Sequence, residues 1–135
     1  MTSSSNLRFI HPEGLAQSPS YTQVVEVRGG RTVYISGQLA MNASGQVVGV
    51  GDVEAQVRQT FENLRLALAA AGMDFSHLVK LGLYLTDMSN LAIMRRVRDE
   101  FVNTAQPPAS TLIQVSALAH PDALFEADAI AAAPD

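Results

Sequence analysis

Cysteine is absent from this chain of 135 residues. Its absence excludes disulfides, thiolate nucleophiles, cysteine-ligated zinc and iron–sulfur clusters. No apolar run approaches the roughly 20 residues of a membrane span, and the polar, Ser-rich residues 1–6 lack the charged and apolar regions of a signal peptide. We therefore expect a cytoplasmic protein without a membrane partner, with residues 1–6 as a flexible N-terminal end.

Positive charge is also scarce, with nine Lys and Arg against 13 Asp and Glu and a formal net charge of −4. Nucleic-acid affinity depends largely on clustered Lys and Arg, so no nucleic-acid partner is expected. Charged residues make up only 16% of the chain, whereas hydrophobic residues make up 47%. The length suits one domain with its own core, and the low charged share indicates apolar surface that other subunits cover.

Common catalytic and cofactor motifs are missing too. The chain has no phosphate loop, dinucleotide fingerprint, His-Glu-x-x-His pair or nucleophile elbow. His11, His77 and His120 are scattered, and none has a second ligand at helical or strand spacing. We expect no metal and no cofactor, and we expect any activity to centre on residues 107–115.

Alternating and β-rich runs predict the strands. Residues 22–27 and 32–35 flank Arg28-Gly29-Gly30-Arg31, and a Gly-Gly pair between such runs favours a tight hairpin. Residues 41–51 contain three glycines and indicate a loop with a short strand. Further strands are predicted at residues 78–85, 111–115 and 124–130.

Apolar residues at steps of three and four predict two helices. Asp52 caps the first and Gly72 ends it; its apolar stripe is Val53, Val57, Phe61, Leu64, Leu68 and Ala71. Ser89 caps the second, which ends before the two prolines at 107 and 108; its stripe is Leu91, Met94, Val97 and Phe101. Both helices can pack on one face of a mixed sheet, which predicts an α+β domain.

Polar groups near strand ends have two interpretations each. Ser36-Gly37-Gln38 follows a strand and forms either a turn or a ligand-binding edge. Glu126 shares a strand face with Asp128. That face is either solvated or, when a neighbouring subunit covers it, suited to proton transfer by a raised carboxyl pKa.

The roles of two further groups of residues are also not fixed by the sequence. Arg95, Arg96 and Arg98 lie mostly off the apolar stripe of the second helix, as is typical of a solvated basic face. Tyr21 either packs its ring and keeps its hydroxyl wet or reaches a ligand from a loop.

Five motifs together resemble those of the RidA/YjgF family, in that family's order and spacing across residues 7–132. They are Val33-Tyr34-Ile35-Ser36-Gly37-Gln38, Gln59-x-Phe61-x-Asn63-Leu64, Ala71-Gly72, Val79-Lys80 with Tyr84-x-x-Asp87, and Pro107-Pro108-Ala109-Ser110-Thr111. The family is also called reactive intermediate (enamine/imine) deaminase or endoribonuclease L-PSP. The resemblance implies one chorismate-mutase-like domain, a homotrimer with a central β-barrel, and ligand clefts between subunits.

For archetypal members, the resemblance implies hydrolysis of enamines or imines such as 2-aminoacrylate to a 2-keto acid and ammonia, without a cofactor. In the family a glutamate on the last strand holds the attacking water, and Glu126 matches that position. Tyr21 matches the family's loop tyrosine, and Ser36, Gly37 and Gln38 lie on the motif near the cleft.

One departure from the family concerns specificity. Archetypal deaminases carry an arginine directly after the Pro-Ala near the penultimate strand, and here Ser110 stands there, followed by Thr111. A serine cannot replace a bidentate cation on a substrate carboxylate. Arg95 stands where the archetype has a nearby asparagine, and we hypothesise that it partly restores the missing charge.

We therefore expect a trimer that hydrolyses an enamine or imine other than 2-aminoacrylate, with Glu126 as the catalytic residue. The alternative is a non-catalytic small-ligand-binding or chaperone-like trimer, which the loss of the arginine favours. Endoribonuclease activity ranks third because the chain is acidic and has no basic–aromatic stripe.

Overall fold

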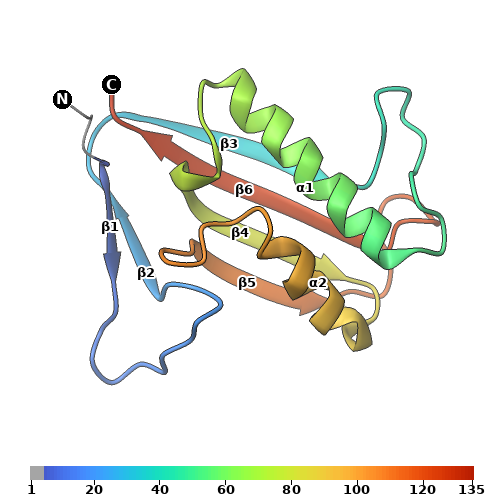
Figure 1. Cartoon of the computed structure of the whole chain (residues 1–135), viewed down its shortest axis with the longest axis horizontal. Helices are drawn as coiled ribbons and strands as arrows, with labels where there is room; N and C mark the ends of the chain where they lie inside the picture. Colours follow the sequence, from blue (N-terminus) through green and yellow to red (C-terminus); the bar gives the residue numbers. More distant parts are fainter. Residues whose placement is uncertain (1–4) are drawn as a thin grey trace.

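The computed structural model describes residues 5–135 as a four-stranded sheet with two helices on one face and a two-stranded sheet at one end (Figure 1). The strands are β1 (Leu7–Ile10), β2 (Val24–Val27), β3 (Arg31–Gln38), β4 (Leu78–Leu85), β5 (Ala109–Gln114) and β6 (Phe125–Ala133). The helices are α1 (Val53–Ala70) and α2 (Leu91–Arg98), with short 3₁₀ helices η1 (Phe75–His77) and η2 (Met88–Asn90). Among these described residues, no helix is long and apolar enough to cross a membrane.

The larger sheet has the strand order β3-β6-β4-β5. Strand β6 pairs antiparallel with β3 and β4, whereas β4 and β5 are parallel and are connected through α2. This mixed sheet with its helices on one face confirms the predicted α+β class. The strands predicted at residues 78–85, 111–115 and 124–130 are confirmed as β4, β5 and β6.

The predicted hairpin between residues 22–27 and 32–35 is wrong, although the strands and the turn exist. Gly29 and Gly30 have φ angles of 59° and 75°, yet β2 pairs with β1 and β3 pairs with β6. Asn6 holds β1 on this turn, because its carbonyl accepts from Arg28 N at 2.9 Å and its amide donates to Gly29 O at 3.1 Å. The remaining part of the expected flexible end, residues 1–4, lies outside the described residues.

Helix α1 has the predicted boundaries. The Asp52 side chain accepts from Ala55 N at 3.1 Å, and Gly72 follows the helix with a φ of 71°, a conformation that favours glycine. The apolar stripe of α1 packs against α2 and the larger sheet. The fully buried side chains there include Val57, Phe61, Leu64, Leu68, Leu85, Met94, Val97 and Phe125.

The predicted Ser89 cap of α2 is wrong. The Asp87 side chain accepts from Ser89 N at 2.9 Å and opens η2 one turn earlier. The N-cap of α2 is Asn90, which makes no side-chain capping bond. Because the carboxylate of Asp87 already binds the Ser89 N–H, the chain turns before the apolar stripe begins.

Gln56 is a fully buried polar residue of α1. Its Nε2 donates to Gly49 O at 3.1 Å and to Asp122 O at 2.9 Å, and its Oε1 accepts from Leu124 N at 2.8 Å. These bonds tie the segments before α1 and before β6 to the helix. Because Leu124 directly precedes β6, Gln56 also positions the start of the central strand.

We expect Gln56→Leu to lower the free energy of unfolding by about 3 kcal/mol, because two carbonyls and one N–H then lose their buried partner. Urea denaturation measures the change. The matched control is Gln59→Leu on the same helix, which removes only a bond to Asn63 Oδ1 and should cost about 1 kcal/mol or less. Equal losses for the two variants would contradict the assigned role of Gln56.

Candidate functional site

The sheet face away from the helices carries most of the polar side chains of the central strands. Lys80, Gly82 and Tyr84 of β4 pair in register with residues 130, 128 and 126 of β6. The residues between and after them on both strands are buried toward the helices, which confirms the predicted alternation from Leu81 onward. At the register shift between Leu78 and Lys80, Leu78 is buried and Val79 only partly so. We call this surface the open face; it consists of Tyr34, Gly37, Lys80, Gly82, Tyr84, Thr111, Ile113, Glu126, Asp128 and Ile130.

Two glycines make room for two carboxylates on the open face. A Cβ atom on Gly37 would collide with the carboxylate of Glu126, and a Cβ atom on Gly82 would collide with Oδ1 of Asp128 and the hydroxyl of Tyr84. That hydroxyl donates to Asp128 Oδ2 at 2.9 Å. The two carboxylates therefore occupy space that any other residue at these two positions would fill.

Glu126 is the carboxyl on this face whose environment suits proton transfer. The pKa of Glu126 is raised above its ordinary value, mainly because the carboxyl is partly buried and to a smaller extent because the charge of Asp128 is close. A carboxyl with a raised pKa keeps its proton to a higher pH and can both donate and accept protons nearer to neutrality. The hydrogen bond to Asp128, followed by burial, likewise raises the pKa of Tyr84.

The loop that bears Tyr21 is joined to the segment before β5. The neighbouring buried residue Thr22 donates its backbone N–H to Pro108 O at 3.1 Å and its hydroxyl to the carbonyl of Pro107. These two bonds hold Tyr21 alongside the start of β5, which bears Ser110. The structure therefore places two of the predicted substrate-binding residues in one region.

Ser110 and Thr111 face opposite sides of β5, because side chains alternate along a strand. Thr111 lies on the open face, where its hydroxyl accepts from Lys80 Nζ at 2.9 Å. Ser110 pairs in register with Leu81, which is buried beneath the helices. Ser110 and Glu126 are separated by two strand spacings of about 5 Å across the sheet and, at right angles to these, by three residues of about 3.3 Å along the strand. The straight-line separation is therefore roughly 14 Å. One small ligand cannot contact both residues of the same chain.

The triplet Ser36-Gly37-Gln38 is divided by a bulge in β3. Gly37 lies against Glu126, and Ser36 is exposed. The Gln38 amide donates to Ser36 O at 3.1 Å and borders a cavity of about 310 Å³ between β3 and α1. The other residues of that cavity are Met41, Asn42, Ala43, Asn63 and Leu66.

Arg95 is exposed on α2, on the helix-covered side of the sheet. Its neighbours have partners: Arg96 binds Glu54 at 2.8 Å, and buried Arg98 binds Asp99 at 2.9 Å. In the part of the chain that the structure describes, no ion pair involves Arg95. A single chain therefore does not bring Arg95 together with Glu126.

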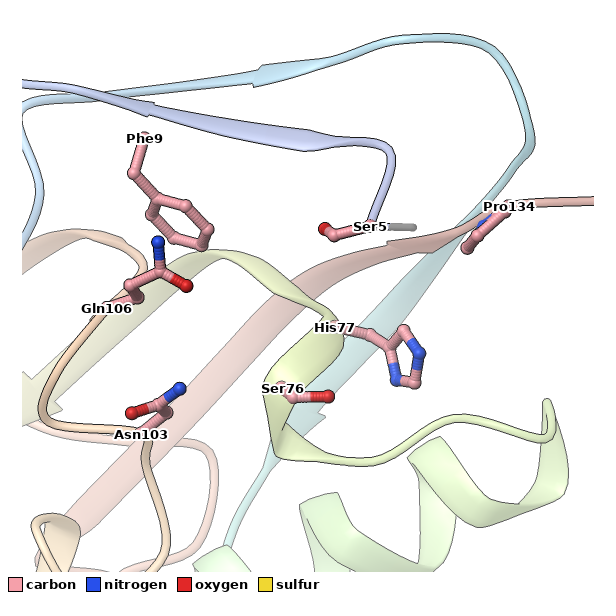
Figure 2. A pocket seen from close by; sticks show the side chains of 7 residues that line it. All are labelled: Ser5, Phe9, Ser76, His77, Asn103, Gln106 and Pro134. Carbon is pink, nitrogen blue, oxygen red and sulfur yellow. The ribbon is translucent and has the colours of Figure 1, made fainter. Parts of the chain in front are cut away.

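A cavity of about 290 Å³ lies away from all of these residues, beneath β1 (Figure 2). Its lining consists of Ser5, Phe9, Ser76, His77, Asn103, Gln106 and Pro134. His77 is its one titratable side chain, and its Nδ1 already accepts from Asp74 N at 3.0 Å in a capping box. Across residues 5–135, no three His, Asp or Glu side chains are grouped as a metal site.

Three residues of the open face were predicted as strand residues but not as site residues. Lys80, Gly82 and Tyr84 alternate along β4, and this alternation was the available signal. The contacts of Gly82 and Tyr84 with Asp128 depend on the register between β4 and β6. That register cannot be read from either strand alone.

Comparisons with known proteins cover nearly the whole chain. The family model described as endoribonuclease L-PSP matches residues 13–133. Protein DfrA of Myxococcus xanthus is 40% identical over 111 residues, covering 82% of this chain and 83% of that protein. A 2-iminobutanoate/2-iminopropanoate deaminase of Capra hircus is 40% identical over 99 residues, covering 73% and 69%. The solved structure of YyfB from Yersinia pestis, a Rid-family protein, has a TM-score of 0.87 at 37% identity and covers 94% of this chain and 98% of that one.

We expect Gly37→Ala to fold but to displace the Glu126 carboxylate, because the added Cβ meets the end of a flexible side chain. Displacement toward solvent reduces burial, so the pKa of Glu126 should fall toward its ordinary value. Carboxyl ¹³C NMR across a pH titration measures this pKa. Ser36→Ala, one residue earlier and exposed, is the matched control and should leave the pKa unchanged; a Gly37→Ala titration identical to wild type would contradict the close contact.

Proposed function

The chain belongs to the RidA/YjgF family, also named endoribonuclease L-PSP, and on this premise we propose that it is an enamine or imine deaminase. The observation that carries the proposal is Glu126, a half-buried carboxyl with a raised pKa seated against Gly37 on the open face. The same position bears the water-holding glutamate in the family pattern. The relative from Capra hircus, whose name specifies an imine substrate, lends further support.

The proposed reaction needs one proton donor and one water molecule. Protonated Glu126 gives its proton to the enamine carbon, and the nitrogen lone pair forms the C=N bond of an iminium ion. Water then adds to the iminium carbon and gives up a proton to the Glu126 carboxylate, which forms a carbinolamine. Glu126 passes that proton to the amine nitrogen, the carbinolamine hydroxyl returns a proton to Glu126 as the C=O bond forms, and the C–N bond breaks to release ammonia and a carbonyl product. Positioned proton transfer of this kind contributes about 10²–10⁴-fold to a rate.

The proposed substrate differs from small amino-acid-derived enamines such as 2-aminoacrylate. Ser110 replaces the arginine that grips a substrate carboxylate in archetypal members, and a neutral hydroxyl forgoes about 1–3 kcal/mol of charge-assisted hydrogen bonding. Exposed Arg95 on α2 is the proposed partial replacement. It reaches a shared cleft only if a second subunit brings that helix to the open face.

We propose that the site forms between copies in a homotrimer. Tyr21 and Ser110 lie together, whereas Glu126 is roughly 14 Å from Ser110 and on the other face of the sheet. The open face also exposes Tyr34 (78%) and Ile113 (43%), and apolar surface of this kind favours burial against another subunit. The cytoplasm is the proposed location, and a small molecule is the proposed ligand.

The second candidate function is a trimer that binds a small ligand without turning it over. Ser110 favours it, because the residue that fixes the archetypal substrate is missing. RNA cleavage ranks last, since the net charge of −4 does not favour a phosphate backbone.

Light scattering after size-exclusion chromatography should give a native mass of three times the 14.4 kDa chain. Ile113→Glu should weaken assembly, because it buries an unpaired charge in the proposed interface. Leu66→Glu is the matched control, since Leu66 is exposed on the helix side (59%). A monomeric wild type would contradict the proposed trimer.

Ammonia release from enzymatically generated 2-aminoacrylate and from larger enamines tests the activity. We expect wild type to favour a larger enamine, and Glu126→Gln to lower kcat/KM about 100-fold because the proton donor is lost.

Ser110→Arg should gain turnover of 2-aminoacrylate, and Ser110→Lys should gain less, because lysine lacks the bidentate fork. Arg95→Ala should raise KM for anionic substrates.

Glu62→Gln, an exposed carboxyl on α1, is the control for charge removal and should retain wild-type turnover. If wild type binds an enamine but releases ammonia from none of them, the deaminase proposal is wrong and the ligand-binding function is supported instead. Unchanged kinetics in Arg95→Ala would remove the proposed compensating charge.

A further inference from the structure

Three ionisable side chains stand next to one another on the open face, and Asp128 is the middle one. Its Oδ2 accepts from the Tyr84 hydroxyl at 2.9 Å. Glu126 lies two residues before it on the same face of β6 and pairs in register with Tyr84. Asp128 is thus connected to Glu126 by charge and to Tyr84 by a hydrogen bond.

Gly82 determines where this pair lies. It pairs in register with Asp128, and a Cβ atom there would meet both Asp128 Oδ1 and the Tyr84 hydroxyl. The Tyr84 hydroxyl and the Asp128 carboxylate therefore pack directly against the backbone of Gly82. Because Tyr84 anchors one oxygen, the Asp128 carboxylate has a fixed position beside Glu126.

We propose that Asp128, anchored by Tyr84 over Gly82, is a positioning residue whose negative charge keeps Glu126 ready to donate a proton. The assignment of proton transfer to Glu126 rests on the proposed function. Two adjacent carboxylates resist being ionised together. The same repulsion favours return of a proton to Glu126 when water attacks the iminium carbon, so one charge assists both proton-transfer steps.

The other groups around Glu126 do not offset this charge. On β4, Lys80 donates a hydrogen bond at 2.9 Å to Thr111 on β5, the strand farther from Glu126. Tyr84 donates its hydroxyl hydrogen bond to Asp128. On β3, Gly37 carries no charge, and Tyr34 is highly exposed at the level of residue 130. On β5, the residues on this face are uncharged. Burial and Asp128 are accordingly the two causes that raise the pKa of Glu126.

Carboxyl ¹³C NMR of the full chain tests the proposal without any substrate. In Asp128→Asn, the midpoint of the Glu126 titration should fall toward its ordinary value, because a like charge nearby is removed while the side chain keeps its size. Glu62→Gln, on α1 at the opposite side of the sheet, should leave that midpoint unchanged. An unchanged Glu126 midpoint in Asp128→Asn overturns the proposal.

Phenol titration by ultraviolet absorbance tests the anchor. The chain has three tyrosines. Tyr84→Phe should remove the phenol whose pKa is raised above its ordinary value, whereas the control Tyr34→Phe should leave that raised titration in place. Asp128→Asn should return the pKa of Tyr84 toward its ordinary value, because the hydrogen-bonded charge is lost. If the pKa of Tyr84 stays raised in Asp128→Asn, the assigned anchor is wrong.

Kinetics then separate this inference from the proposed function. Activity that needs protonated Glu126 falls as pH rises through its pKa, so the fall should occur at lower pH in Asp128→Asn than in wild type. Active enzyme with the same pH profile in both proteins overturns the positioning role. Shifted Glu126 and Tyr84 titrations in a protein that hydrolyses no enamine support the arrangement and overturn the deaminase.

Discussion

The inner strand β6 has a hydrogen-bonded neighbour on both edges, and its side chains alternate between the two faces of the sheet. Toward the helices it presents Phe125 and a row of buried alanines, which allow α1 to approach closely. Toward the other side it presents Glu126 and Asp128. A one-residue slip of this strand would put both carboxylates into the core and the alanines outside, so the core and the site depend on the same register.

The open face follows from that register together with two missing side chains. Gly37 and Gly82 leave space for Glu126 and Asp128, one on each strand beside β6. Without them the carboxylates would move toward solvent, where burial would no longer raise the pKa of Glu126. In the proposed reaction, the contribution of the fold is therefore to control the position and hydration of two carboxyl groups.

Much of the fold was predictable, because local signals agreed with the tertiary packing. Asp52, the apolar stripe and Gly72 specified α1 within one continuous segment, and the alternation of β4 and β6 specified which residues face the core. The two failures have different causes. The Gly-Gly turn is real, but its flanking strands pair with distant segments. Ser89 is not the cap of α2 because Asp87 opens the short helix η2, which contains Ser89, one turn earlier. A short strand such as β1 carries too little pattern to be recognised before its partner is known.

The sequence by itself determined the α+β class, the faces of the central strands, the family motifs and the presence of a serine at position 110. These depend on residue type and on spacing within one element. Only the tertiary structure decided that Gly82 and Tyr84 belong with Asp128, that Ser110 and Thr111 lie on opposite faces, and that Gln38 borders a cavity whose lining does not include Glu126. Such relations depend on register between strands that are far apart in the chain, and no single segment encodes its partner's alignment.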